Sequence, residues 1–210
     1  MNQFHTTANL FFMDTIRYPE ITILQHSFTF ITGKSGCGKS TYLKILNRSI
    51  PSQKNAVFFR ENPITDYEIL PYRRQVLLIP QTVYLIKGSI LDNFAFYYEN
   101  RQEPMPSEER MKFFLSLCSL DMDLNASCDT LSGGERQRVF LAVFLSFAQD
   151  TVLLDEPTAA LDDKTAEIVM KNLKKYFREQ NLTAVCVCHN RHIVKKYADT
   201  VIDMEKLTHA

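Results

Sequence analysis

The sequence GKSGCGKST, residues 33–41, matches the phosphate-loop pattern G-x-x-x-x-G-K-[ST]. The apolar run at residues 27–32 before it has the composition of a strand, and residues 42–47 after it have that of a helix. A loop at such a corner collects backbone N–H groups into an anion site, to which the helix adds the positive end of its dipole. The pattern therefore predicts that this corner binds the phosphates of a nucleotide.

Glycine is concentrated in this loop, which holds three of the chain's 6 glycines. The alternative is an accidental Gly-rich turn, and so local an enrichment argues against it. We expect the Lys39 ammonium to bridge the β- and γ-phosphates, and the Ser40 hydroxyl to be a ligand of Mg²⁺, a cation that prefers oxygen. The residues predicted to contact the nucleotide here are Gly33, Ser35, Gly36, Cys37, Gly38, Lys39, Ser40 and Thr41.

The composition is that of an ordinary globular protein, because 45% of the 210 residues are hydrophobic and 23% are charged. A formal net charge of +0 provides no general attraction to nucleic acid, so no nucleic-acid partner is expected. The first residues lack the pattern of a signal peptide, and no apolar run is long enough to span a bilayer. The five cysteines show no paired metal spacing, so reduced thiols in a cytoplasmic protein are expected.

Strand and helix patterns alternate along most of the chain, which predicts an α/β fold with a mostly parallel sheet covered on both faces. Two early strands, at residues 9–14 and 20–32, predict an antiparallel N-terminal portion. Residues 82–129 instead contain helical segments near 90–98 and 107–120, which indicate a mostly helical insertion. The other expected strands are 55–59, 76–79, 151–155, 183–188 and 200–203, and the other expected helices are 39–48, one from Gly133, 163–180 and 191–197.

Asp155 and Glu156 stand at the end of an apolar strand, as two adjacent acids. Ligands of α/β sheets bind beyond the carboxyl ends of the strands, so both acids are expected beside the phosphate loop. Asp155 would hold Mg²⁺ through its water shell, and Glu156 would orient and deprotonate the water that attacks the γ-phosphate. The alternative is an acidic turn after a strand, which the neighbouring phosphate loop makes weaker.

The sequence LSGGERQR, residues 131–138, holds two further glycines at the start of an expected helix. Ser132, Gly133 and Gly134 would form a second anion site there, which one chain with one nucleotide does not need. A plain helix cap is the alternative. The motif resembles the signature of the ATP-binding cassette (ABC) ATPases, in which the signature of one subunit closes over the ATP in the phosphate loop of another. The resemblance implies a head-to-tail dimer in the ATP-bound state, formed with an identical subunit or a paralogue.

The resemblance extends to other motifs of the family, which follow in the family's order over nearly the whole chain. It implies that Gln81 contacts Mg²⁺ and the attacking water, and that His189 contacts the γ-phosphate and supports the transition state. Residues 158–162 resemble the family's D-loop, which crosses the dimer interface, and Asp162 is its acid. Tyr18 stands where the family keeps an aromatic ring that stacks on adenine.

The resemblance implies a single ABC ATPase domain over residues 1–210. Its RecA-like core would comprise about residues 1–81 and 131–210, and its helical subdomain about residues 82–130. Two features depart from the family's pattern. Residues 24–33 lack the Gly-Glu turn that usually precedes the strand entering the phosphate loop, which bears on the N-terminal sheet and the adenine pocket. Ala142-Val143 also stands where an Ala-Arg pair is common.

The function that the resemblance implies is Mg²⁺-dependent ATP hydrolysis, with Lys39, Gln81, Glu156 and His189 as catalytic residues. Our first hypothesis is the ATP-binding subunit of a transporter whose permease is a separate membrane chain, which would hold it at the inner face of the cell membrane. Aromatic rings of the helical insertion would offer a groove to a short permease helix. Residues 81–93 resemble export-type cassettes, which favours export. A soluble ATPase, such as one serving iron-sulfur assembly, and a non-catalytic nucleotide switch are the alternatives.

Overall fold

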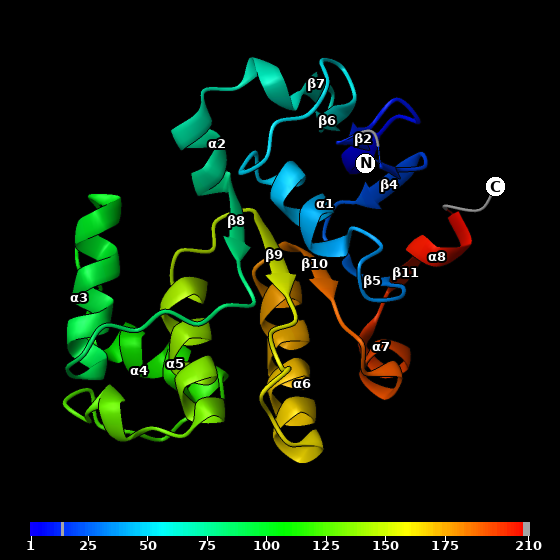
Figure 1. Ribbon diagram of the computed structural model, residues 1–210. Helices are drawn as coiled ribbons and strands as arrows, with labels where there is room; N and C mark the ends of the chain where they lie inside the picture. Colours follow the sequence, from blue (N-terminus) through cyan, green and yellow to red (C-terminus); the bar gives the residue numbers. More distant parts are fainter. Residues whose placement is uncertain (14, 208–210) are drawn as a thin grey trace.

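The computed structural model describes residues 1–13 and 15–207. Its centre is a parallel sheet in the order β11-β5-β10-β9-β8 (Figure 1). β9 and β10 are buried along their whole length, because helices cover both faces of the sheet. The mostly parallel α/β sheet predicted from the sequence is confirmed. The strands are Phe28–Thr32 (β5), Val76–Ile79 (β8), Thr151–Asp155 (β9), Thr183–Val187 (β10) and Thr200–Asp203 (β11).

The antiparallel portion is also present, as a sheet in the order β4-β1-β6-β7 and a separate β2-β3 hairpin. Its strands are Asn2–Thr6 (β1), Phe11–Phe12 (β2), Ile16–Arg17 (β3), Ile21–Leu24 (β4), Val57–Phe59 (β6) and Asn62–Pro63 (β7). β1 was not expected, because its sequence NQFHT has one apolar residue and a register shift between Asn2 and Phe4 interrupts its alternation. The strand expected at residues 9–14 is reduced to β2, and Asp14 lies outside the described residues.

The expectation of one strand over residues 20–32 is wrong. β4 pairs antiparallel with β1, whereas β5 belongs to the parallel sheet. The chain turns between them at His26, whose φ of 54° lies in the left-handed region that side chains rarely adopt. A turn without glycine or proline, between two runs of β-branched and aromatic residues, gives no sequence signal of a break.

The helices largely follow the predicted pattern: Lys39–Leu46 (α1), Ile90–Arg101 (α3), Glu108–Leu117 (α4), Gly133–Leu145 (α5), Asp163–Glu179 (α6) and Arg191–Tyr197 (α7). The structure adds Ile69–Gln75 (α2), Met204–Leu207 (α8) and the 3-10 turns Ile64–Asp66 and Cys128–Thr130. α2 was missed because it contains Pro71, which reads as a breaker. Proline is tolerated there because the first turn of a helix makes no intrahelical bond through its N–H groups.

Two apolar clusters lie on the two faces of the parallel sheet. The first holds α1 between the two sheets, with Tyr42 and Leu43 among its fully buried side chains. The second extends from the sheet through α5 and α6 to Phe94 of α3 and Phe114 of α4. The expected helical insertion is therefore present as α3 and α4, which lie beside α5 in Figure 1. No helix in the described part of the chain is long and apolar enough to cross a bilayer.

Candidate active site

The phosphate loop joins the end of β5 to the start of α1, as predicted. Gly36 and Gly38 have φ values of 82° and 91°, which glycine adopts without strain. A Cβ atom on Gly38 would lie 2.8 Å from the hydroxyl of Tyr18, so a larger residue has neither the conformation nor the space. The two glycines thus shape the loop, and the first-turn N–H groups of α1 remain available at its mouth.

Lys39, the first residue of α1, lies across this loop. Its side chain is buried, and its Nζ atom donates to the carbonyl oxygens of Gly33 at 2.9 Å and Lys34 at 2.8 Å. An ammonium held in this way carries a positive charge inside a loop that already presents backbone N–H groups. The arrangement suits a polyphosphate.

Ser40 and Asp155 meet where α1 begins and β9 ends. The Ser40 hydroxyl donates to Asp155 Oδ1 at 2.8 Å. Burial raises the pKa of Asp155 above its usual 3.8, the bond from Ser40 opposes this, and the Glu156 carboxylate raises the pKa further. The Ser40 hydroxyl and the poorly solvated Asp155 carboxylate are two oxygen donors that fit a Mg²⁺ ion, which prefers hard oxygen donors and keeps several of its waters.

Glu156, Gln81 and His189 meet beyond the carboxyl ends of β9, β8 and β10. Glu156 Oε2 accepts a hydrogen bond from Gln81 Nε2 at 3.1 Å, and Glu156 Oε1 lies 3.0 Å from His189 Nε2. The Glu156 side chain is 22% exposed and that of His189 is 49% exposed, so both are accessible to a ligand. The three residues lie far apart in the sequence, and parallel strands bring them to one edge of the sheet.

The signature residues lie at the start of α5, and the structure shows the helix cap that was the alternative. The Ser132 hydroxyl accepts from the N–H of Glu135 at 3.3 Å and donates to its carboxylate at 2.7 Å, which lowers the pKa of Glu135. Ser132 and Gly133 are nevertheless exposed, and a Cβ atom on Gly133 would meet nothing within 4 Å. Within the described residues, no hydrogen bond joins Ser132, Gly133 or Gly134 to the phosphate loop of the same chain. The cap therefore leaves this surface open.

Asp162 caps the next helix, α6. Its Oδ1 atom accepts from the N–H of Thr165 at 3.0 Å, and hydrogen bonds to this carboxylate lower its pKa. Asp162 is exposed, so the cap leaves it at the surface where a D-loop acid is expected.

The expectation that Tyr18 stacks on adenine is wrong. Its side chain is 2% exposed, its ring packs against Tyr42 with 5.3 Å between centroids, and its hydroxyl donates to the Gly38 carbonyl at 3.0 Å. A ring covered on its faces supports the loop and has no face to offer a base. Sequence reasoning did not single out Phe12, a partly exposed aromatic ring near the phosphate loop. Phe12 pairs across the β2-β3 hairpin with Ile16, whose side chain lies beside Gly38 in space.

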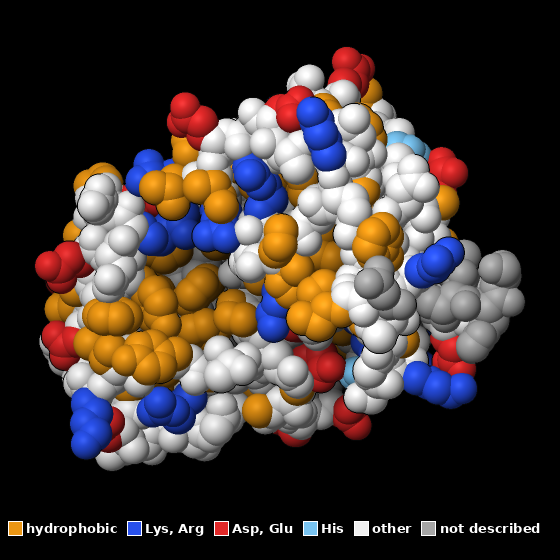
Figure 2. Space-filling view, turned by 45° about the horizontal axis from the view of Figure 1, so that its top comes forward, with side chains coloured by type: hydrophobic (Ala, Val, Ile, Leu, Met, Phe, Trp, Pro, Cys, Tyr) orange, Lys and Arg blue, Asp and Glu red, His pale blue; other side chains and the backbone are white. Residues whose placement is uncertain are grey.

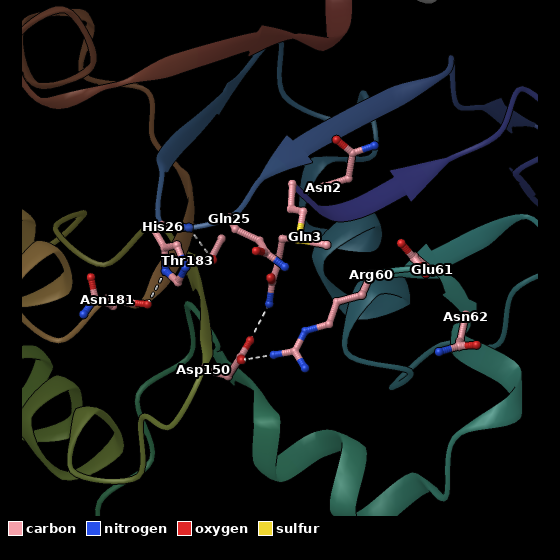
Figure 3. Close-up of a pocket in the computed structure, with 11 residues that line it drawn as sticks. Asn2, Gln3, Gln25, His26, Arg60, Glu61, Asn62, Asp150, Asn181 and Thr183 are labelled. Carbon is pink, nitrogen blue, oxygen red and sulfur yellow. Dashed lines mark hydrogen bonds and ion pairs between the residues drawn. The ribbon is translucent and has the colours of Figure 1, made fainter.

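A cavity of about 580 Å³ lies at the opposite edge of the sheet, by the amino ends of β9 and β10. Asp150 there accepts hydrogen bonds from the Gln3 amide of β1 and the Arg60 guanidinium that follows β6, as Figure 3 shows. Gln3 also donates to the Thr151 hydroxyl at 2.6 Å. These groups pair with one another, so this polar cluster joins the antiparallel sheet to the core.

Comparison with known proteins adds the identity of the family. Residues 18–159 match the model of the family described as "ABC transporter". The chain belongs to the ABC transporter family. As a member of that family the cassette binds and hydrolyses ATP, and the P-loop fold implied by the resemblance is confirmed.

Curated relatives of the cassette are named for transport in both directions. It is 34% identical over 178 residues to the "Probable iron export ATP-binding protein FetA" of Escherichia coli, with 85% of this chain and 79% of that protein covered. It is 33% identical over 188 residues to the "Spermidine/putrescine import ATP-binding protein PotA" of Clostridium novyi, with 89% of this chain and 54% of that protein covered. The chain thus spans only about half of the second relative.

Solved structures of similar cassettes include a dimer. The dimeric bacterial cassette MJ0796 superimposes with a TM-score of 0.80 at 26% identity, over 96% of this chain and 94% of that one. The same cassette is known as a dimer in a post-hydrolysis state bound to ADP and Pi, with a TM-score of 0.79. A bacterial Atm1-family exporter with ATP bound has a TM-score of 0.85 at 20% identity, covering 98% of this chain and 37% of that one, and it shows the fold alone.

Proposed function

We propose that this cassette powers a separate membrane permease by binding and hydrolysing ATP in a head-to-tail dimer. One observation carries the proposal: Glu156, Gln81 and His189 converge beside the phosphate loop, while Ser132 and Gly133 remain exposed and, within the described part of the chain, form hydrogen bonds only in their own helix turn. Each chain then supplies half of two active sites. The dimeric MJ0796 structures support this arrangement.

The residues of the cassette divide the chemistry among them. Lys39 and the loop amides bind the β- and γ-phosphates, and Ser40 with Asp155 would hold Mg²⁺. The bound cation would supply charge neutralisation between the phosphates. Glu156 accepts the proton of the attacking water, Gln81 orients that carboxylate through its 3.1 Å bond, and His189 faces the γ-phosphate.

The Glu156→Gln variant tests this assignment. The amide cannot take a proton from water, so we expect ATP to bind and hydrolysis to fall by about 100-fold or more. The unhydrolysed ATP should then hold two subunits together, giving a dimer in sedimentation velocity with ATP and a monomer with ADP. Turnover at the wild-type rate by this variant would refute the role of Glu156.

The permease is proposed to dock on an aromatic groove beside α2 and α3. Tyr84, which follows Gln81, is 60% exposed, and its ring lies 6.2 Å from that of Phe96 in α3. Leu70 of α2 is 68% exposed. Figure 2 shows apolar side chains gathered in a hollow on this part of the molecule, with Lys and Arg side chains along its upper edge. A short amphipathic helix of the permease fits such a groove and would hold the cassette at the inner face of the membrane.

A charged residue in this groove should separate membrane attachment from catalysis. We expect Leu70→Glu to move the cassette from the membrane fraction to the soluble fraction of its native cells, with the ATPase rate of the purified protein within about twofold of wild type. Ile168→Glu is the matched control, because Ile168 is a 41% exposed apolar residue on α6. Equal membrane attachment of the two variants, or recovery of the wild type only with soluble partners, would favour the soluble ATPase alternative.

We infer export as the direction of transport, from the likeness of residues 81–93 to export-type cassettes. The name of the Escherichia coli relative supports export, and that of the Clostridium novyi relative supports import. Deleting the gene in its native cells should therefore raise the cellular content of the transported compound. A fall in that content would establish import.

A further inference from the structure

The side chain of Gln137 connects α5 to the loop that carries Glu156. It is a buried residue, and its amide group makes two hydrogen bonds to backbone. Its Nε2 atom donates to the carbonyl oxygen of Glu156 at 3.1 Å, and its Oε1 atom accepts from the N–H of Ala160 at 2.9 Å. One amide thus spans the whole turn that runs from Glu156 into the D-loop.

The backbone of Glu156 needs such support. Its φ of 50° lies in the left-handed region, which is unfavourable for a residue with a side chain. Its N–H donates to the Val187 carbonyl at 3.1 Å, which fixes one side of the residue to β10. Its carbonyl accepts from the Ala159 N–H at 3.2 Å and from Gln137, which fixes the other side. Gln137 is the member of this set that lies on a helix, α5.

The same turn of α5 also packs against the D-loop backbone. A Cβ atom on Gly134 would lie 3.1 Å from the Ala160 carbonyl oxygen and 3.3 Å from a methyl carbon of Leu161. Gly134 and Gln137 stand three residues apart, so they share one face of the helix. The signature end of α5 and the turn after Glu156 are therefore in direct contact through two residues.

We propose that Gln137 is a positioning residue that holds Glu156 in its catalytic conformation and links it to the signature motif of the same subunit. The inference rests on the proposed role of Glu156 and on the proposed dimer. In that dimer the signature of one subunit contacts the ATP of its partner, whereas Glu156 acts on the ATP of its own phosphate loop. Gln137 therefore connects the two active sites of the dimer.

The Gln137→Met variant removes both hydrogen bonds and keeps the length of the side chain. We expect kcat to fall by about tenfold or more, with KM for ATP and nucleotide affinity within about twofold of wild type. The Hill coefficient for ATP should also fall toward 1, because the sites lose their connection. Asn47→Leu is the control, since the Asn47 amide is as buried as that of Gln137 and donates to the Val76 carbonyl, away from Glu156.

The Gln137→Glu variant provides a second readout if the methionine variant does not fold. A glutamate can still accept from Ala160, but only its protonated form can donate to the Glu156 carbonyl. We therefore expect the ratio of its kcat to that of wild type to rise as the pH is lowered from about 8 to about 6, in the manner of a buried carboxyl group. The same ratio for Gln137→Met should not change with pH.

A kcat for Gln137→Met within about twofold of the Asn47→Leu value, or a pH-independent ratio for Gln137→Glu, would overturn the proposal. The Glu156→Gln variant distinguishes this failure from a failure of the proposed function. If Glu156→Gln is inactive while Gln137→Met is active, only the role of Gln137 is refuted. If Glu156→Gln hydrolyses ATP at the wild-type rate, the assignment of the base is wrong.

Discussion

Asp155 lies where a negative charge is unfavourable in free energy, and a carboxylate in such a place is suited to binding a cation. It is 4% exposed, adjacent to Glu156, and bonded to the Ser40 hydroxyl. Its raised pKa means that the folded protein holds the proton more tightly than the unfolded chain. Without a cation, protonated Asp155 contributes its full stabilisation below about pH 3.8, its usual pKa in the unfolded chain. This stabilisation is lost as the pH rises through the higher pKa of Asp155 in the folded protein. A bound Mg²⁺ would offset the free-energy cost of the charged Asp155 carboxylate.

Replacing Asp155 with asparagine should therefore stabilise the protein free of Mg²⁺ and nucleotide. The asparagine oxygen still accepts from Ser40, and the buried charge is removed. We expect the melting temperature at pH 7 to rise by about 2–4 °C, the difference to shrink toward pH 3.8, and ATPase activity to be lost. Asp121→Asn, an exposed control, should change neither by much. A lower melting temperature for Asp155→Asn than for wild type at pH 7 would contradict this account.

Some site residues were predictable from the sequence because their position follows from local order. A phosphate loop fixes Lys39 and Ser40. The ends of two apolar strands, β9 and β10, fix Asp155, Glu156 and His189 at one edge of the sheet. Tyr18 was not predictable in this way. Its burial depends on the β2-β3 hairpin and on Tyr42, which come together only in the folded chain, and its neighbours in sequence carry no sign of this.

At the scale of elements, the two sheets are held together at their far edge by Asp150, Gln3 and Arg60 (Figure 3). The carboxylate directly precedes β9, while its two donors belong to β1 and to the turn between β6 and β7. β1 itself was not predicted, and neither was this cluster. Polar side chains that pair across 147 and 90 residues of sequence leave no local pattern.

Asp150→Ala should loosen this joint without affecting the chemistry. Loss of the carboxylate leaves the buried Gln3 amide with one acceptor fewer, so we expect the free energy of unfolding in urea to fall by about 1–3 kcal/mol. The ATPase rate per folded molecule should stay the same, since the cluster lies at the amino ends of the strands. Glu61→Ala, at an exposed neighbour in the same cavity, is the control. An unchanged unfolding midpoint would show that the cluster does not hold the sheets.

The fold at this scale was otherwise largely predictable. Helices α3 to α7 have a polar residue as their N-cap, and the strands of the parallel sheet are short apolar runs. The errors occurred where local signals conflict with tertiary structure. α2 contains Pro71 in its first turn, and proline usually indicates the end of a helix. The chain turns between β4 and β5 at His26, where a glycine would have indicated a turn.

At the scale of the whole molecule, our proposal divides each active site between two cassettes. The phosphate loop, Asp155 and Glu156 lie together, whereas Ser132 and Gly133 at the start of α5 are exposed and, among the described residues, make no hydrogen bond to the phosphate loop of their own chain. ATP would therefore act between subunits, and its hydrolysis would release them. A permease in contact with both subunits would change its conformation as they associate and separate.

Mixing two inactive variants tests this central claim most directly. Lys39→Ala removes the ammonium from the phosphate loop, and Ser132→Arg blocks the signature surface, so each homodimer should be inactive. A mixed dimer regains one intact site, formed by the loop of the second variant and the signature of the first. The account predicts that mixing equal amounts restores ATPase activity, to at most about a quarter of the wild-type rate, because random assortment makes half of the dimers mixed and each mixed dimer has one intact site of two. No recovery of activity, from variants that are folded and able to associate, would contradict the head-to-tail dimer.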